Sequence, residues 1–556
     1  MQKLTLLILS ILYCFSTNAQ QATILKEINP NGSSYYGDIT FVHNDIMYFL
    51  ANDGTTGPEL WRSDGTTTGT YLLKEIFPDA NNYIFSIDFA VLGNEIIMGV
   101  AGKSDDYAIW KTDGTTQGTV LVSTLSNDYP DWRDRLVTLG NYVYFAGYST
   151  ANGPELWRTD GTPSGTSMVK NISSSSSRGP KRPMVWNNKL LFYHEGSQGY
   201  ELWTSDGTEV GTTLVKDINP GSFGSMSVLP QEFDLVATPI GVFFTANDGT
   251  NGQELWITDG TEAGTKMVKN INSSTINDGA VLNGAQEGYQ NYAFLNGKFY
   301  FNGTDATNGD ELWATDGTTA GTTLVKNAVS GASGLRIRDM VVLNNQLIFN
   351  ASTTNEGNEM WISDGTSAGT KLIKDIAPSF GNGVGPSYDV VVYANRVWFS
   401  GQDLIGGGEL WRTDGTAMGT EMVQNINPGF ANSYPEALTV LGDKLLFFAN
   451  NGSPENYELY SIFDPAVATN EPAAVIRSVY INPNPNSGYF QLYTDTTFPE
   501  NATVQIVSML GQVVSTTNWV NNNQLFETSH FAKGLYHLIV RDAQGKTLSS
   551  HSLLMQ

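Results

Sequence analysis

The chain has 556 residues, with 30 Lys and Arg against 55 Asp and Glu, and a formal net charge of −25 at pH 7. This length allows several domains or one large array, and the negative charge repels phosphate backbones, which argues against nucleic acid as a partner. The single cysteine, Cys14, lies in an N-terminal apolar segment, so the rest of the chain offers neither disulfides nor a cysteine-ligated zinc site.

The first residues have the pattern of a secretory signal peptide. Lys3 precedes an apolar run from Leu4 to Phe15, and the small residues Thr17 and Ala19 fit cleavage after Ala19. This run is too short for a stable membrane span, and no later stretch is apolar enough to be one. We therefore expect residues 1–19 to be removed during export and no transmembrane segment in the remainder.

A motif that reads Glu-Leu-Trp-x-Thr/Ser-Asp-Gly-Thr-x-x-Gly-Thr begins at Glu59 and recurs at intervals of 46 to 57 residues. A repeated period of this size, with atypical terminal copies, indicates a repeat architecture. The ninth copy is degenerate and reads Glu458-Leu459-Tyr460-Ser461. We expect the repeated tryptophans to pack between neighbouring repeats rather than to bind sugars; they are Trp61, Trp110, Trp157, Trp203, Trp256, Trp313, Trp361 and Trp411.

Each repeat contains four short runs of aromatic and β-branched residues, separated by Gly, Asn and Asp, which predicts four strands, a to d. In the sixth repeat these runs are 292–295, 298–301, 311–314 and 323–326. Residues 23–30 resemble a strand d without its a, b and c, and the ninth repeat (437–463) lacks strand d.

One missing strand at each end is what a closed ring requires, because the first strand can complete the last sheet. We therefore predict an all-β fold, a nine-bladed β-propeller over residues 22–463 that is closed by its N-terminal strand. Eight blades is the alternative if the second repeat, whose strand c is Ala108-Ile109-Trp110, is merged with a neighbour.

Strand parity assigns the loops to two faces. The short a–b turns and the Asp-Gly-Thr c–d turns are nearly identical in every repeat and share one face, which we call the uniform face. The b–c turns and the d–a crossings share the other face, and their lengths vary, so we call it the variable face. Variable loops on a rigid scaffold commonly carry binding sites, and we assign the working surface to the variable face.

Acidic b–c turns are the candidate ligand contacts on the variable face. Such turns supply carboxylate, amide and carbonyl oxygens, which are the ligands that Ca²⁺ prefers, although turn geometry alone also explains an Asp-Gly pair. The predicted binding residues are Asp53, Asp248, Asp305 and Asp403, and calcium is a possible ligand at Asp53, Asp248 and Asp305. Along strand c, Glu254, Trp256 and Thr258 alternate onto one side, and we expect the glutamate to be held by backbone N–H groups between blades.

No catalytic residues are predicted. The two histidines of the array, His43 and His194, lie in different repeats, and neither a zinc-protease motif nor a nucleophile elbow is present. We therefore expect a binding or adhesion protein whose ligand is a glycan or another protein. The alternatives are a secreted carbohydrate-active enzyme that uses a pair of carboxylates on the variable face and a purely structural surface protein.

After a Pro- and Ala-rich linker at 464–478, a separate β-domain is expected at 479–556, with the length of a seven-stranded sandwich. Its motifs are Ile481-Asn482-Pro483-Asn484-Pro485-Asn486-Ser487-Gly488, Ser508-Met509-Leu510-Gly511-Gln512-Val513-Val514, Lys533-Gly534-Leu535-Tyr536 and Gln544-Gly545-Lys546. In this order they resemble the C-terminal sorting domain (type A) of the Bacteroidota type IX secretion system.

That resemblance implies the type IX secretion machinery as a partner, transit of the periplasm, and a final location that is secreted or on the outer cell surface. The body of the chain likewise resembles the family of proteins built from ELWxxDGT repeats. That family is defined by its sequence and implies no settled activity.

Overall fold

The computed structural model describes residues 21–555 apart from the stretches 56, 78–82, 104–105, 126–135, 174–178, 222–223, 226–233, 273–278, 281, 283–289, 330, 332–333, 379–380, 386–389, 453–455, 465–478, 483–488, 495–501, 509–512, 520–523, 529, 532–533 and 542–546. The chain divides into two compact units, Met1–Asp464 and Pro465–Gln556. The predicted signal peptide and nearly all of the predicted linker lie outside the described residues.

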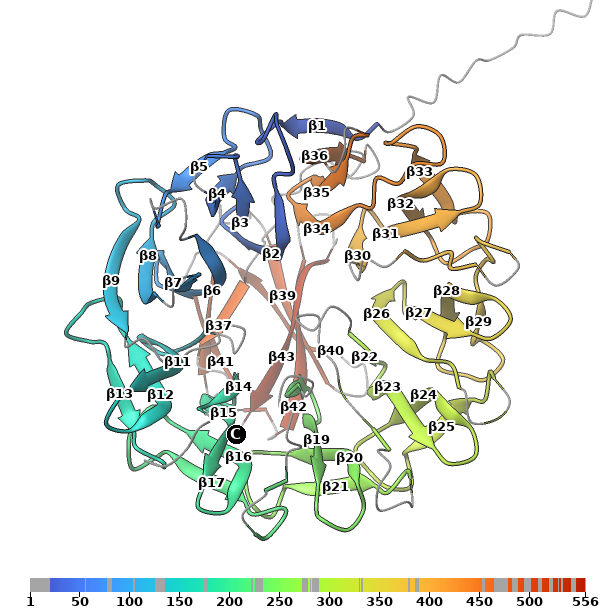
Figure 1. The fold of residues 1–556 in the computed structure, drawn as a ribbon. Coiled ribbons are helices and arrows are strands. Elements are labelled where there is room, and N and C mark those ends of the chain that lie inside the picture. The colour runs from blue at the N-terminus through green and yellow to red at the C-terminus, as the bar shows by residue number, and fades with distance from the viewer. Residues whose placement is uncertain are drawn as a thin grey trace, which may run out of the picture. The chain divides into compact units, whose positions relative to one another are not determined.

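The first unit is propeller-like and all-β. Its described residues form nine four-stranded antiparallel sheets, which stand around a ring with strands such as β2 and β6 near the centre and β5 and β9 at the rim (Figure 1). Eight of these sheets are built from consecutive strands: β2 (Tyr35–His43), β3 (Ile46–Asn52), β4 (Pro58–Ser63) and β5 (Tyr71–Lys74); β6 (Ile84–Leu92), β7 (Glu95–Gly102), β8 (Tyr107–Thr112) and β9 (Val120–Leu125); β10 (Val137–Leu139), β11 (Tyr142–Ser149), β12 (Gly153–Thr159) and β13 (Ser167–Lys170); β14 (Lys181–Trp186), β15 (Lys189–Gly196), β16 (Gly199–Ser205) and β17 (Thr213–Lys216); β18 (Val236–Thr238), β19 (Gly241–Asn247), β20 (Gln253–Thr258) and β21 (Lys266–Lys269); β22 (Tyr292–Leu295), β23 (Lys298–Asp305), β24 (Gly309–Thr315) and β25 (Thr323–Lys326); β26 (Ile337–Leu343), β27 (Gln346–Thr353), β28 (Gly357–Ser363) and β29 (Lys371–Leu372); β30 (Val390–Tyr393), β31 (Arg396–Asp403), β32 (Gly407–Thr413) and β33 (Glu421–Gln424).

The remaining sheet of this unit joins the two ends of the array. It has the order β1-β36-β35-β34 and comprises β34 (Glu436–Leu441), β35 (Lys444–Asn450), β36 (Tyr457–Phe463) and β1 (Thr23–Lys26). Strand β1 runs antiparallel to β36, with Ile24 opposite Tyr460. The N-terminal strand therefore occupies the place of the missing strand d, which is the pairing that the sequence predicts, and the second repeat has a sheet of its own.

The Asp-Gly-Thr turn is stabilised by its own side chains. In the turn after β16, Asp206 Oδ1 accepts hydrogen bonds from the N–H of Thr208 at 2.9 Å and from its hydroxyl at 2.7 Å. Gly207 has a φ of 88°, and a Cβ on Gly211 would lie 2.0 Å from the Asp206 carboxylate. The bond from Thr208 lowers the pKa of Asp206. Turn geometry thus accounts for Asp206, Gly207, Thr208 and Gly211 of the repeated motif.

The repeated tryptophans pack against the preceding sheet. Trp256 of β20, for example, is buried among Leu191, Leu202 and Val215 of the sheet before it. The ammonium group of Lys216 lies 6.0 Å from the centre of the Trp256 ring and donates to the Thr265 carbonyl at 2.7 Å. The hydrophobic core of this unit therefore consists of a series of contacts between neighbouring sheets, whereas a smaller domain has a single core.

A buried glutamate at the start of eight of the nine repeated motifs binds the crossing that leaves its own sheet. Glu201 on β16 accepts hydrogen bonds from the N–H of Asn219 at 3.1 Å and from the Ser225 hydroxyl at 2.6 Å. Seven further glutamates accept backbone N–H groups of the residues that follow the outer strand of their sheet: Glu59, Glu155, Glu254, Glu311, Glu359, Glu409 and Glu458. These donors begin the d–a crossings, so each glutamate connects a sheet to the segment that leads to the next one. The second repeat has Ala108 at this position.

Burial decides the ionisation of these carboxyl groups. Removal from water raises the pKa of Glu59, Glu201, Glu359 and Glu409 to about 7, although the hydrogen bonds that each accepts favour the charged form. The same cause raises the pKa of Glu311 and Glu458.

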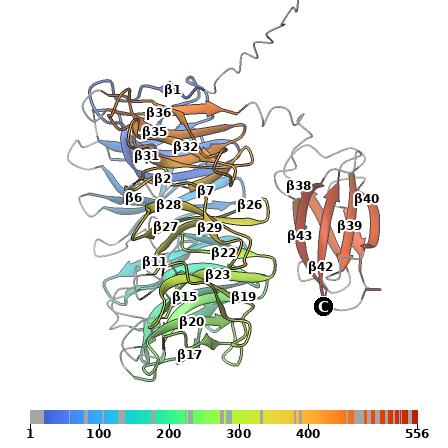
Figure 2. The same ribbon diagram turned by 90° about the vertical axis from the view of Figure 1, so that its right-hand side faces the viewer.

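The second unit is a small β-sandwich. Its described residues form a sheet of β37 (Val479–Asn482), β38 (Tyr489–Thr494) and β41 (Gln524–Glu527), and a sheet of β40 (Val513–Trp519), β39 (Ala502–Ser508), β42 (Gly534–Arg541) and β43 (Thr547–Met555). The larger sheet is seen in Figure 2. Phe490 and Leu492 of one sheet pack with Val504 and Leu538 of the other in a shared core. In the part of the chain that is described, no helix has the length and apolarity needed to cross a membrane.

Deletion of residues 21–29 should destabilise the first unit and promote self-association. The deletion removes β1, exposes the edge of β36 and takes away the N–H groups of Ile28 and Asn29 that Glu458 accepts. Thermal unfolding should show a lower Tm than for the chain that begins at residue 21, and size-exclusion chromatography should show oligomers. An unchanged Tm and a monomeric profile would contradict closure by β1.

The Tm of the protein should rise as the pH is lowered from 8 to 5. A carboxyl group whose pKa is about 7 when folded and 4.5 when unfolded binds its proton more tightly in the folded state. The resulting stabilisation is complete below pH 4.5 and is lost as the pH rises through 7, and it amounts to at most about 3 kcal/mol for each such group. Glu201→Gln should make the Tm profile less steep over this range, because it removes one of the four carboxyl groups whose pKa is about 7, whereas Glu262→Gln, at an exposed position, should leave the slope unchanged. A wild-type Tm that increases from pH 5 to pH 8 would refute the assignment.

Candidate functional site

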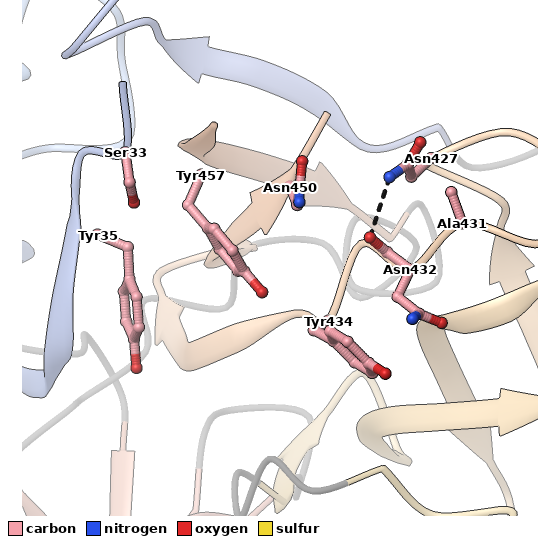
Figure 3. Close-up of a pocket in the computed structure, with 8 residues that line it drawn as sticks. All are labelled: Ser33, Tyr35, Asn427, Ala431, Asn432, Tyr434, Asn450 and Tyr457. Carbon is pink, nitrogen blue, oxygen red and sulfur yellow. Dashed lines mark hydrogen bonds between the residues drawn. The ribbon is translucent and has the colours of Figure 1, made fainter. Parts of the chain in front are cut away.

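A cavity of about 600 Å³ lies on the variable face, where the two ends of the array meet. Its walls come from the end of the crossing between β1 and β2 together with the first residue of β2, from the crossing between β33 and β34, and from the last residue of β35 and the first residue of β36 (Figure 3). The described lining residues are Ser33, Tyr35, Asn427, Ala431, Asn432, Tyr434, Asn450 and Tyr457. We call this cavity the seam pocket. Its volume lies in the range of small-molecule and side-chain binding sites.

Three tyrosines give the seam pocket its aromatic walls. The rings of Tyr35 and Tyr457 are 5.6 Å apart between centres and inclined by 30°, and Tyr35 also packs at 5.5 Å from Phe448. Tyr434 borders the same space from the other crossing (Figure 3). An aromatic ring presents a flat apolar face and, in tyrosine, a hydroxyl at its edge. Such walls suit a ligand that combines apolar surface with neutral polar groups.

Asparagines form the polar part of the seam pocket. Asn427 Nδ2 donates to the carbonyl of Asn432 at 3.0 Å (Figure 3), and Asn432 Oδ1 accepts the N–H of Gly408 at 2.7 Å. Asn450 Oδ1 accepts the N–H of Gly452 at 2.9 Å. These bonds fix the amide planes, which is a requirement for selective recognition of neutral polar ligands. The eight lining residues include no charged side chain.

Two of the buried glutamates hold the walls of the seam pocket. Glu409 accepts the N–H of Ile426 at 2.7 Å and the Ser433 hydroxyl at 2.6 Å, which ties down the crossing that carries Asn427, Asn432 and Tyr434. Glu458 accepts the N–H of Ile28 at 2.6 Å at the start of the opposite crossing. The contact that joins neighbouring sheets therefore also shapes this cavity.

The backbone of Tyr434 has a φ of 39°, which is unusual for a bulky residue. Its ring lies against Gly408, where a Cβ would come within 2.5 Å of Tyr434 Cε1. Backbone strain of this kind persists only where the surroundings impose it, and it concentrates at functional sites. The strained tyrosine supports the choice of the seam pocket as the candidate site.

The four predicted binding aspartates lie in b–c turns of four different sheets. Asp53 follows β3, Asp248 follows β19, Asp305 ends β23 and Asp403 ends β31. Each carboxylate accepts N–H groups within its own turn, such as the N–H of Thr55 at 2.9 Å for Asp53. The structure does not bring these four residues together, although Gly408 of β32, the strand after the turn of Asp403, donates its N–H to Asn432 of the seam pocket.

Calcium at Asp53, Asp248 and Asp305 stays a prediction from the sequence. Among the described residues, no three His, Cys, Asp or Glu side chains gather in a way that could hold a metal ion. The carboxylate oxygens of Asp248 accept the N–H groups of Thr250 and Asn251 and the Asn251 amide. Turn geometry therefore accounts for these aspartates.

His194 is buried between two neighbouring sheets, where it contacts a glutamate. Its Nε2 lies 3.1 Å from Glu155 Oε2 of the preceding sheet, and both side chains are fully buried. Its Nδ1 lies 2.9 Å from the carbonyl of Glu195. A histidine enclosed in this way joins two sheets and offers no surface to a substrate.

The sequence analysis missed the seam pocket. Tyr35 and Tyr434 follow serines at equivalent places in two crossings, in the segments Ser34-Tyr35 and Ser433-Tyr434. This recurrence could have been noticed, since both crossings follow an Asn-Pro pair after strand d. That Tyr457 joins them could not be deduced without the closed ring.

Comparison with known families identifies the second unit. Residues 478–552 match the family described as secretion system C-terminal sorting domain. This match implies export through the type IX secretion system and a place at the cell surface, with the secretion machinery as a partner of the tail. No curated protein sequence matches the chain.

Several solved structures are similar at low identity. PorZ, described as an essential bacterial surface component of the type IX secretion system of Porphyromonas gingivalis, is 12% identical, with 93% of this chain and 80% of that chain covered and a TM-score of 0.33. Oligopeptidase B from Leishmania major is 12% identical (67% and 52% covered, TM-score 0.37), and a prolyl endopeptidase is 11% identical (67% and 55% covered, TM-score 0.36). The chain spans about half the length of these two peptidases.

Asn432→Ala should loosen the crossing that carries Tyr434. The change removes the acceptor for the N–H of Gly408, and the loss of one partly buried hydrogen bond should cost about 1 kcal/mol of unfolding free energy. Chemical denaturation of the full chain measures this cost. Asn425→Ala, in an exposed position of the same crossing, is the matched control and should cost less. Equal stability of the two variants would show that Asn432 does not order the pocket.

Proposed function

We propose that the chain is a nine-bladed β-propeller which is carried to the cell surface and binds a glycan or a protein in the seam pocket. In this proposal residues 1–19 are a signal peptide, 22–463 the propeller, 464–478 a linker and 479–556 the sorting domain. The sorting-domain match supports the export, and the nine four-stranded sheets among the described residues support the blade count.

One observation carries the binding function. The seam pocket combines the rings of Tyr35, Tyr434 and Tyr457 with fixed asparagine amides on the face whose loops vary. Aromatic and amide side chains bind neutral ligands through stacking and directed hydrogen bonds. A purely structural surface protein would not need a concave, strained and aromatic site.

Hydrolysis of glycans is the second candidate activity. It needs two carboxyl groups a few ångströms apart on either side of the scissile bond, and the eight described residues that line the seam pocket include neither Asp nor Glu. The lining therefore favours binding over hydrolysis.

The exported chain, residues 20–556, should bind at least one member of an array of bacterial and host polysaccharides and extracellular matrix proteins, with saturation. Tyr457→Ala should weaken this binding at least tenfold. A tenfold loss corresponds to about 1.4 kcal/mol of binding free energy, which is less than an aromatic stacking contact and the burial of its surface contribute together. Tyr71→Ala on the rim strand β5, where the tyrosine is exposed, is the matched control and should bind like the wild type. Analysis of bound polysaccharide for shortened products separates a binder from an enzyme. An affinity that Tyr457→Ala leaves unchanged, or the absence of any saturable ligand, would refute the proposal.

A further inference from the structure

The b–c turn of the sheet β30–β33 departs from its equivalents in one respect. Asp403 Oδ1 accepts the N–H of Ile405 at 2.9 Å, just as Asp248 accepts the N–H of Thr250 at 2.9 Å and Asp305 that of Thr307 at 2.8 Å. The turn is thus held by its aspartate in each case. These hydrogen bonds involve the backbone of the tip residues and not their side chains.

The tip residues are polar or small elsewhere and large and apolar here. The equivalent pairs are Gly54-Thr55, Gly249-Thr250 and Ala306-Thr307, whereas this turn has Leu404-Ile405. Leu404 is 65% exposed and Ile405 76% exposed, and Phe430 in the neighbouring crossing is 80% exposed. We call these three residues the apolar ridge. Exposed apolar side chains that do not serve the fold mark interaction surfaces when they are grouped.

The turn that carries Leu404 and Ile405 leads into β32, whose first residues contact the crossing that lines the seam pocket. The N–H of Ser433 donates to the carbonyl of Gly408 at 2.8 Å, and the N–H of Gly408 donates to Asn432 Oδ1 at 2.7 Å. A Cβ on Gly407 would lie 2.5 Å from the carbonyl oxygen of Ala431. The turn that carries Leu404 and Ile405 therefore lies against the crossing that carries Phe430 and Tyr434.

We infer that the ligand of the seam pocket is a polypeptide, which inserts a large apolar side chain between the tyrosines and lays further apolar residues on the apolar ridge; this rests on the proposed function. Aromatic and aliphatic side chains with few charges are typical of the centres of protein interfaces. A sugar would use the tyrosines but would gain little from Leu404 and Ile405, which have no flat face or polar group to offer it.

Charge selects among polypeptide partners. The eight described residues that line the seam pocket carry no charge, while Asp403 stands in the turn that carries Leu404 and Ile405, and the whole chain carries a net charge of −25. Complementary charges at an interface rim accelerate association and exclude partners of the same sign. The expected ligand segment therefore has an apolar anchor flanked by Lys or Arg.

Selection of a phage-displayed library of random dodecapeptides on the exported chain, residues 20–556, tests this inference. The enriched peptides should contain Phe, Trp or Leu next to Lys or Arg, and a synthetic copy should bind in solution. The double variant Leu404→Thr with Ile405→Asn, and separately Phe430→Ser, should weaken this peptide at least tenfold while the Tm stays unchanged, because the replaced side chains are exposed. Val210→Thr is the matched control; Val210 is 88% exposed in a c–d turn on the uniform face, and its variant should bind like the wild type.

Three results would overturn the inference. One is a peptide selection without enrichment, and another is a peptide whose affinity the ridge variants leave unchanged. The third is saturable binding of a polysaccharide, or of phosphatidylcholine vesicles, that accounts for all ligand capture by the chain. A polysaccharide that depends on Tyr457 but not on the ridge would still support the proposed function, so the two proposals fail separately.

Discussion

The fold depends on a buried glutamate that accepts backbone N–H groups from the segment leaving its own sheet. The outer strands are short, four residues in β17 and two in β29, so they cannot direct the following chain by themselves. A carboxylate such as Glu201, fixed on the longer strand β16, receives the first donors of the crossing at hydrogen-bond distance. Bonds to charged or partly charged acceptors are worth about 1.5–3 kcal/mol each, enough to set the course of a crossing. Burial opposes this gain because it disfavours the charged form of the carboxyl group, and the pKa of Glu201 is raised as a result.

The same contact, used twice at the junction of the two chain ends, builds the candidate site. Glu409 and Glu458 hold the crossings that supply Tyr434 and Tyr35. Elsewhere the ring repeats itself, and the turns on the uniform face are determined by their own hydrogen bonds. Differences between repeats are thus the informative feature, and Leu404 and Ile405 are differences that the fold does not require.

Much of the architecture could be predicted from the sequence, because local patterns determine it. The four runs of the sixth repeat correspond to β22–β25, and the all-β class and the sorting domain at the end of the chain are confirmed. The site could not be predicted in the same way. The acidic turns led to the prediction that Asp53, Asp248, Asp305 and Asp403 bind the ligand. In the structure each of these aspartates accepts a hydrogen bond within its own turn. Tyr35 and Tyr457 meet only through ring closure, which no local pattern reveals.

Closure by β1 also determines when the seam pocket can form during folding. Strand β1 is made first and its partner β36 among the last of the array, so their pairing has the longest loop to close in the first unit. The eight other sheets are each formed from neighbouring strands and do not wait for that event. Tyr35 and Tyr457 come together with the same closure. A chain that is still incomplete, or still unpaired at its ends, has no seam pocket, so the presence of this pocket reports that the whole ring has folded.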